Sequence, residues 1–496
     1  MKNTKRILSL ISANFSKMAL VVFLFYGCYP KSKNNNHKQN VRPNIVWIMA
    51  ENIGPDLGCY GTPAVKTPNL DNMAKEGILY KKAFTTAPVC SPSRAAMMTG
   101  AYQISTNTQH LRMNTSRRLP EPHKAITYYL RKAGYYTALG CGYSGKTDIN
   151  FSPKEGHLSG FDGDDWKHRK PGQPFFAQIT LPITHRGNNW YSDSPDVVKY
   201  KEMDNPKTPF YYLPAFVDSV NPKDVVLPPT IPDHPVIRDD WARYLTQIEK
   251  MDVQVGQILQ RIKDEGIEDN TIVIFISDNG ADIYREEYWL YDGGIHVPMI
   301  VRWPGKLKAS EVNDDLISTI DISATILEIA DVKVPDYMDG VPFIGLNTKK
   351  RNYIYAARDR IDGRIDRIRC VRSERYKYIR NFMPEKGYRE TRWVMINNPT
   401  LTVIQKLYKE GKLTPIQALH MAKNKAPEEL YDLSIDPHEF NNLVDAPEYQ
   451  KTLEKMRALL NNWIEETGDT GQYPEKREDA KETTWFNFND AYGNVE

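Results

Sequence analysis

The chain has 496 residues, and although 26% of them are charged, the formal net charge is only +3. The length exceeds one minimal core, so we expect a large α/β domain followed by a smaller one. A nearly balanced charge argues against a dedicated nucleic-acid-binding protein, and five cysteines are too few for a disulfide scaffold. Past the N-terminus, no segment approaches the roughly 20 apolar residues that span a bilayer.

The N-terminal region has the pattern of an export signal. A basic start precedes a short apolar stretch at positions 18–26, and Gly27 and Cys28 follow as in a loose bacterial lipobox. We therefore expect a lipoprotein-type signal peptide at residues 1–28, with Cys28 as the lipidated first residue of the mature protein, and a polar linker at residues 29–41. The expected location is outside the cytoplasm, in the periplasm or at the surface of a bacterium, anchored to the membrane by lipid.

The mature chain alternates buried strands with helices. Apolar runs at 44–50, 175–180 and 271–277 are rich in β-branched and aromatic residues, which is typical of buried parallel strands. Apolar residues recur at helical spacing over 245–262, and Gly266 ends that helix. The pattern predicts an α/β fold, with a mostly parallel sheet between helices and ligands at the carboxyl ends of the strands.

Two of the predicted strands run directly into polar pairs. Glu51 and Asn52 follow the first strand, and Asp278 and Asn279 follow the strand at 271–277. Two carboxylates and two amides, brought together at one edge of a sheet, suit Ca²⁺ better than Zn²⁺. Taken singly, either pair is equally typical of a helix cap or a turn.

A third polar segment contains a candidate nucleophile. Cys90 stands two residues before Pro92 and four before Arg94, so a small nucleophilic side chain lies beside a turn-forming proline and a fixed cation. Residues 94–99 look helical, which would place Cys90 just ahead of a helix N-terminus, where anions are favoured. The alternative is a buried structural cysteine near a surface turn.

The sequence Cys-Ser-Pro-Ser-Arg at positions 90–94 closely resembles the Cys-x-Pro-x-Arg signature of the type I sulfatases. In that family a maturation enzyme oxidises the cysteine to formylglycine (3-oxoalanine), which is the nucleophile. The similarity also covers positions 67–71, 291–298 and 429–433, and resembles most the heparan sulfamidase-like branch, which includes many bacterial enzymes that act on sulfated polysaccharides. It implies an alkaline-phosphatase-like fold, with a catalytic domain at 42–347 and a smaller α+β subdomain at 348–496.

The resemblance also implies a metal site. Sulfatases bind one Ca²⁺ through two acidic residues after the first strand, an Asp-Asn pair after a later strand, and the formylglycine loop. The corresponding residues here are Glu51, Asn52, Cys90, Asp278 and Asn279. Because the family usually has two aspartates where this chain has Glu51 and Asn52, the site has one negative charge fewer.

Further roles follow from the same resemblance. Arg94 and Lys146 would hold the sulfate oxygens, Asp278 would act as base, and His185 would protonate the departing sugar oxygen. Asp148 stands where the family has a histidine, and could take over that residue's role as base.

The candidate substrate contacts come from several segments. His110 and Arg112 are expected at the substrate unless they lie in a solvated loop, and His185 has the alternative of a satisfied core histidine. His296 stands at the arginine position of a loop that resembles the family's Glu-Gly-Gly-x-Arg-Val-Pro. The predicted substrate-binding residues are His110, Arg112, Asp148, Arg285 and His296.

One departure affects the sulfate pocket directly. The family has a lysine that contacts sulfate about five residues before the acidic residue of the Gly-Gly loop, and this chain has Glu287 there. Since a carboxylate would repel sulfate, we expect Arg285 to take the place of the lysine. Glu287 would then contact a substrate hydroxyl or a neighbouring arginine.

Three classes of protein remain compatible with these residues. The first is a formylglycine-dependent sulfatase that acts on a sulfated polysaccharide or its oligosaccharides, with ulvan, carrageenan and heparan all open. The second is a phosphatase or phosphodiesterase of the related fold, which would need a Ser or Thr nucleophile and a two-metal cluster. The third is a catalytically silent binder of sulfated glycans. The stretch at 190–212 is a candidate specificity loop.

Overall fold

The computed structural model describes residues 42–114, 117–152, 160–186, 220–388, 398–471, 473 and 475–476. The predicted signal and linker, the lipidation at Cys28 and the candidate loop at 190–212 lie outside the described residues. No helix in the described ranges has both the length and the apolar character to cross a membrane.

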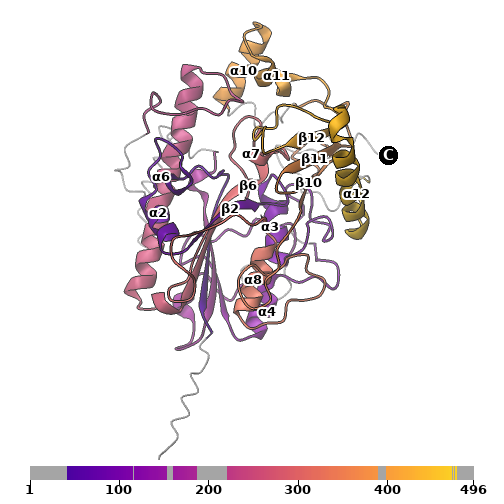
Figure 1. Ribbon diagram of the computed structural model, residues 1–496. Coiled ribbons are helices and arrows are strands. Elements are labelled where there is room, and N and C mark those ends of the chain that lie inside the picture. The colour runs from indigo at the N-terminus through magenta and orange to yellow at the C-terminus, as the bar shows by residue number, and fades with distance from the viewer. Residues whose placement is uncertain are drawn as a thin grey trace, which may run out of the picture. The chain divides into compact units, whose positions relative to one another are not determined.

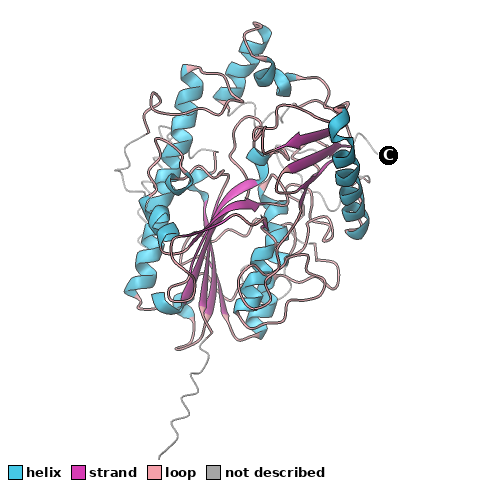
Figure 2. Ribbon diagram, in the orientation of Figure 1, coloured by secondary structure: helices cyan, strands magenta, loops and turns pink. Residues whose placement is uncertain are grey.

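The described residues form an eight-stranded mixed sheet in the order β3-β4-β1-β5-β6-β2-β7, with β8 paired to β2 (Figures 1 and 2). Four neighbouring strands run parallel: β3 (Tyr136–Leu139), β4 (Phe175–Leu181), β1 (Asn44–Ala50) and β5 (Thr271–Ser277). The antiparallel β6 (His296–Arg302) connects them to β2 (Ile78–Phe84), which pairs in parallel with β7 (Glu311–Asn313) and β8 (Ile317–Ser318). The three predicted strands are confirmed, since β1 and β5 have the predicted bounds and β4 extends one residue further.

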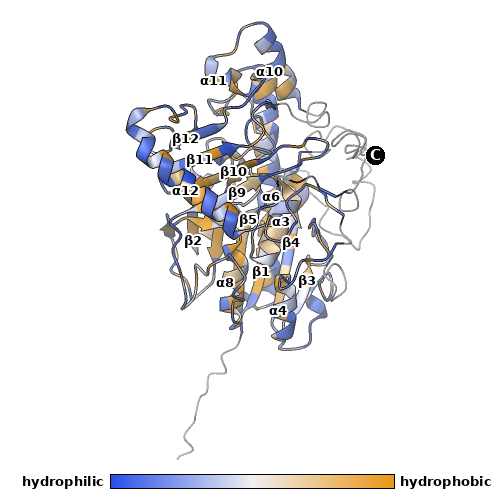
Figure 3. Ribbon diagram, turned by 90° about the vertical axis from the view of Figure 1, so that its right-hand side faces the viewer, coloured by the Kyte–Doolittle hydropathy of each residue, from blue (hydrophilic) through white to orange (hydrophobic). Residues whose placement is uncertain are grey.

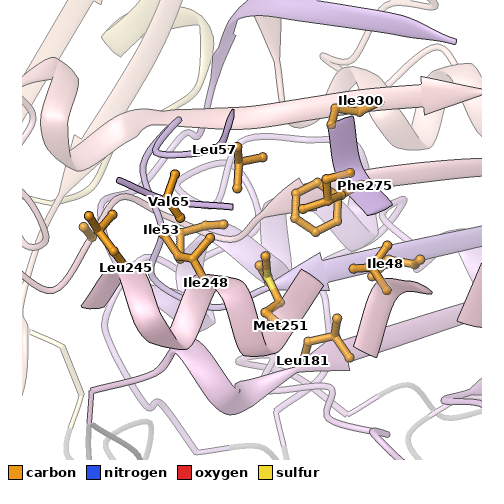
Figure 4. Close-up of a cluster of buried hydrophobic side chains, with 14 of the residues drawn as sticks. Ile48, Ile53, Leu57, Val65, Leu181, Leu245, Ile248, Met251, Phe275 and Ile300 are labelled. Carbon is orange, nitrogen blue, oxygen red and sulfur yellow. The ribbon is translucent and has the colours of Figure 1, made fainter. Parts of the chain in front are cut away.

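Helices cover both faces of this sheet (Figure 1). One face packs against α2 (Pro68–Lys75) and the predicted long helix α6 (Pro235–Asp264), which also contacts α10 (Pro399–Lys409). The other face packs against α3 (Cys90–Thr99), α4 (Ile126–Lys132) and α8 (Asp321–Ile329). In Figure 4, Leu245 of α6 lies beside Val65 and Ile53, and Met251 of the same helix lies nearer the strand residues Ile48 and Phe275. The core therefore holds the strand ends in place from both sides.

A smaller antiparallel sheet follows in the chain, in the order β12-β11-β10-β9 (Figure 3). Its strands are β9 (Ile354–Arg358), β10 (Ile368–Arg372), β11 (Tyr376–Asn381) and β12 (Glu428–Asp432). Helix α12 (Gln450–Glu466) buries Leu453, Met456, Leu460 and Trp463 against β10 and β11. The short helices α7 (Asp292–Ile295) and α11 (Pro415–Ala418) lie in the connections. The predicted α/β class is thus confirmed, while a domain boundary at 347/348 stays a prediction.

The helix after the nucleophile motif begins earlier than expected. Its first residue is Cys90 and its N-cap is Val89, so Cys90 lies inside the first turn and not ahead of it. Proline is compatible with a first helical turn because that turn's N–H groups have no partner within the helix. Pro92 therefore lies within the first turn of the helix, where the sequence had suggested a turn before it.

Candidate active site

The polar residues that follow β1 and β5 meet, as the parallel pairing of the two strands requires. Ala50 pairs with Ser277 at the ends of these strands. The backbone N–H of Asn52 donates to Asp278 Oδ1 at 3.0 Å. Asn52 has a φ of 53°, a left-handed conformation that asparagine tolerates better than most residues. The turn after β1 is therefore held against the end of β5.

Arg94 connects three strand ends from the first turns of α3. Its guanidinium is 0% exposed and donates to Asp278 Oδ2 at 2.8 Å, Glu51 Oε1 at 3.1 Å and Thr180 Oγ1 at 3.0 Å. Ser93 adds a bond from its hydroxyl to the Asp278 carbonyl at 2.6 Å. Thr180 was not predicted, although a polar side chain at the carboxyl end of β4 is the same signal that identified the other two strand ends.

Cys90 lies against the first of these strand ends. Its Sγ is 3.6 Å from Asn52 Oδ1, and the side chain is buried. Burial, reinforced by the negative charge of Asp278, raises the pKa of the Cys90 thiol. An unmodified thiol at this position therefore stays protonated, which makes it a weak nucleophile.

Lys146 forms a second cationic contact with the same carboxylate that Arg94 binds. Its Nζ is 2.9 Å from Glu51 Oε1 and 3.2 Å from Asp148 Oδ2. Burial acts to raise the pKa of Glu51, but the charges of Arg94 and Lys146 outweigh it, and the pKa is lowered. Burial likewise acts against the charged form of Lys146, and its pKa is nonetheless raised by Asp148 and Glu51. The ion pairs with Glu51 and Asp148 therefore keep the two cations, Arg94 and Lys146, beside Cys90.

His185 stands at the end of β4, on the same edge of the sheet. It follows the short 3-10 turn η3 (Pro182–Thr184), and the Thr184 hydroxyl donates to the Glu51 carbonyl. His185 lies close enough to Glu51 and Asp282 to interact electrostatically with both carboxyl groups. The structure therefore brings His185 to the cluster that contains Glu51 and Arg94.

The two candidates from the loop at 110–112 differ in their surroundings. Arg112 is held by Ser91 Oγ, which accepts from its backbone N–H at 2.9 Å, and by an ion pair with Asp362 at 3.2 Å. Its side chain is 40% exposed, so it is open to a ligand. His110 is buried, and its Nδ1 accepts from the backbone N–H of Arg360 at 3.3 Å. The alternative of a solvated loop does not hold for His110.

Two predicted substrate contacts have partners within the protein. Arg285 donates from its two terminal nitrogens to the carbonyls of His438 and Glu439, both at 2.6 Å, and lies 4.1 Å over the Tyr291 ring. The ring of His296 bonds the Lys81 carbonyl and stacks on Phe84 at 4.8 Å. The structure therefore does not place Arg285 at the position of the missing lysine, and the substrate contact of His296 stays a prediction.

Glu287 is directed into the cluster instead. Its side chain is only 4% exposed, and its carboxylate is bonded to Asn52. Burial, together with the charges of Asp282 and Asp278, raises the pKa of Glu287 well above its ordinary value. Its hydrogen-bonding neighbours among the described residues are Asn52 and Tyr288 and not the expected arginine, while the contact with a substrate hydroxyl stays a prediction.

The fit of a cation can be judged from oxygens that lack partners. Within the described ranges, no three His, Cys, Asp or Glu side chains form a group that could hold a metal ion. Arg94 lies between Glu51 and Asp278, and the other predicted ligands are two amides and Cys90. However, Asn279 Oδ1 and Glu287 Oε2 are both buried and accept no hydrogen bond from the described residues. Buried oxygens without donors favour a bound cation, so the donor chemistry fits Ca²⁺.

Comparisons with known proteins agree with this arrangement. The family model described as Sulfatase matches residues 43–166 and 162–332, and one described as N-sulphoglucosamine sulphohydrolase, C-terminal, matches residues 282–419. An ulvan-active sulfatase of Formosa agariphila is 35% identical, over 88% of this chain and 76% of its own. The human N-sulphoglucosamine sulphohydrolase is 25% identical, over 86% of this chain and 90% of its own.

A solved structure shares the fold. It holds its substrate D-glucosamine-2-N,6-O-disulfate, covers 86% of this chain and 99% of its own, and has a TM-score of 0.59 at 18% identity. This similarity confirms the alkaline-phosphatase-like architecture that the sequence predicted. With the family model matched across the main sheet, and a relative at 35% identity along most of the chain, the protein belongs to the sulfatase family of sulfuric ester hydrolases.

Proposed function

We propose that the protein removes sulfate from a sulfated polysaccharide or its oligosaccharides, using formylglycine made from Cys90 by a maturation enzyme and one bound Ca²⁺. The observation that carries the proposal is the buried cluster in which Arg94 and Lys146 lie beside Cys90 and share Glu51. The ulvan-active relative makes ulvan oligosaccharides the first substrates to test, with carrageenan and heparan oligosaccharides beside them.

In this proposal the ligands of Ca²⁺ are Glu51, Asn52, Asp278, Asn279 and the modified side chain at position 90. When present, formylglycine supplies the attacking hydroxyl, and Ca²⁺ polarises a sulfate oxygen and lowers the pKa of that hydroxyl. Asp278 lies next to position 90 and takes up the proton of the nucleophile. Arg94 uses three of its five N–H groups within the cluster, which leaves two for sulfate oxygens.

The remaining roles depend on residues at the rim of the cluster. Lys146 is fixed between Glu51 and Asp148, so its charge stays beside the sulfate position. His185, at the end of β4, donates a proton to the departing sugar oxygen. Arg112, held by Asp362 and partly exposed, contacts an anionic group of the substrate.

The test is the variant Cys90→Ala. We expect sulfate release to be nearly abolished, with an unchanged circular dichroism spectrum, because the thiol donates only one long contact, to Asn52. Turnover above about a tenth of wild type, a barrier change under about 1.4 kcal/mol, would contradict the nucleophile assignment. The intact mass of the Cys90 peptide separates an enzyme from a silent glycan binder, since only a matured enzyme carries the aldehyde.

Metal dependence is the second part of the test. Chelation is expected to lower activity, and added Ca²⁺ to restore it, because the donors are hard oxygens. Stoichiometric zinc in the purified protein would contradict the site and favour the phosphatase alternative.

We also propose export with lipid anchoring at Cys28, which a Cys28→Ala variant tests by release of the protein from the membrane fraction.

A further inference from the structure

Glu287 is held inward by the backbone of its own loop. Its N–H donates to the Ala281 carbonyl at 2.9 Å, and the N–H of Tyr288 donates to the Pro88 carbonyl at 3.0 Å. Arg285 and Tyr288 have φ values of 72° and 75°, in the left-handed region that such side chains rarely adopt. Strain of this kind persists only where surrounding contacts impose it. The loop is therefore shaped so that Glu287 points at the end of β5 while Arg285 points away.

The carboxylate of Glu287 lies in surroundings that are poor in positive charge. It lies beside Asn52 and Tyr288 and faces the carboxylates of Asp278 and Asp282. Its Oε2 is buried and has no hydrogen-bond partner among the described residues. A buried carboxylate oxygen without a donor, among other carboxylates, costs free energy unless a cation compensates it.

The cluster as a whole carries a surplus of negative charge. When all four of its carboxyl groups are ionised (Glu51, Asp148, Asp278 and Glu287), the cluster has two negative charges more than its two cations, Arg94 and Lys146, compensate. Both cations are already bound to the first three of these carboxylates. One divalent cation would balance the surplus, and Glu287 is the carboxylate that neither arginine nor lysine contacts in this group.

We propose that Glu287 is an anionic ligand of the bound Ca²⁺ and supplies the negative charge that Asn52 lacks. The inference rests on the proposed function, because it concerns the same cation. Its geometric support is the buried Oε2 of Glu287, which accepts no hydrogen bond from the described residues, and the backbone bonds that turn this side chain towards Asn52. Calcium accepts six to eight oxygen ligands from flexible sites, and its affinity follows the number of charged ligands. Glu287 therefore strengthens the binding of Ca²⁺, whereas the lysine that the family has at this position contacts sulfate.

The experiment measures Ca²⁺ affinity directly, by isothermal titration calorimetry on chelator-treated full-length protein. For Glu287→Gln we expect the Kd to rise about tenfold or more, because one charged ligand is lost. Adding Asn52→Asp to Glu287→Gln should return the Kd to within about threefold of wild type, because the charge count is restored. Glu286→Gln is the matched control: it makes the same change one residue away, in a side chain that lies near Asp56, and should leave the Kd unchanged.

The outcomes separate this inference from the proposed function. If wild-type protein binds no Ca²⁺, the metal of the proposed function is wrong. If wild type binds Ca²⁺ and Glu287→Gln binds it equally well, only the role of Glu287 is wrong. Should Glu287→Gln fail to fold, Glu287→Asp decides, because it keeps the charge but shortens the side chain: the Kd should rise if Glu287 binds the cation, and stay at the wild-type value if it does not.

Discussion

Each of the two sheet regions contains a fully buried arginine, and the ion-pair networks around these two arginines have different roles. Arg369, in β10, bridges Asp359 and Asp469 and donates through all five N–H groups, with the carbonyls of Arg358 and Ile368 as its remaining partners. Arg94, in α3, bridges Glu51 and Asp278 but uses only three N–H groups. The guanidinium of Arg369 therefore has no N–H group left for a ligand. The network around Arg94 leaves donors and carboxylate charge unused, which is what a binding site requires.

The comparison predicts the largest effect for Arg94→Met. Removing donors that face the reacting group costs about a hundredfold to a thousandfold in kcat. We expect kcat/KM for sulfate release to fall by at least that factor, measured per folded molecule after correction for the folded fraction. Activity within about threefold of wild type would show that Arg94 is structural, like Arg369.

The matching change in the other network is Arg369→Met, which should lower the free energy of unfolding and leave catalysis unchanged. Removing one partner of a buried ion pair costs about 3–5 kcal/mol, because Asp359 and Asp469 lose their counter-charge. Urea unfolding should show this loss in the free energy of unfolding, while kcat/KM of the folded fraction stays at the wild-type value. A fall in kcat/KM without a loss of stability would reverse the assignment.

A smaller effect is expected at the ion pair that connects the region of the smaller sheet to the candidate active site. Asp362, in the loop between β9 and β10, holds the partly exposed Arg112 at 3.2 Å. Because Arg112 is partly open to solvent while Asp362 is buried, we take the upper part of the range of about 0.2–1 kcal/mol for surface ion pairs, so Asp362→Asn should raise KM about twofold to fivefold and leave kcat unchanged. In a variant that already carries Arg112→Gln, adding Asp362→Asn should not raise KM further. Additive effects would mean that Asp362 acts on the substrate independently of Arg112.

The smallest effect concerns pH. Burial acts to raise the pKa of Asp469, but Arg369 outweighs it and lowers the pKa from 3.8 to about 2. Because the folded value lies below the unfolded one, the carboxylate contributes stability that is fully present above pH 3.8 and is lost as the pH falls towards 2. The difference in Tm between wild type and Asp469→Asn should therefore shrink on acidification from pH 6 to pH 3. A constant difference would exclude this linkage.

Much of the site could be predicted because its residues lie at the carboxyl ends of strands. β1 and β5 are apolar on both faces, so their bounds and parallel pairing were readable, and the pairs Glu51–Asn52 and Asp278–Asn279 had to meet at one edge. Thr180, at the end of β4, obeys the same rule and was overlooked. The start of α3 was misplaced by one turn, because Pro92 is compatible with a first helical turn as well as with a loop.

The sequence by itself determined the α/β class, the nucleophile motif and the strand-end carboxylates, since apolar periodicity and strand termination are local properties. The tertiary structure alone decided which side chain of the loop at 285–288 enters the site. Arg285 is turned outward by carbonyls at His438 and Glu439, about 150 residues further along the chain, while contacts with Asn52 and Pro88 hold Glu287 inward. The direction of a side chain in an irregular loop depends on such distant partners, and no periodicity in the sequence encodes it.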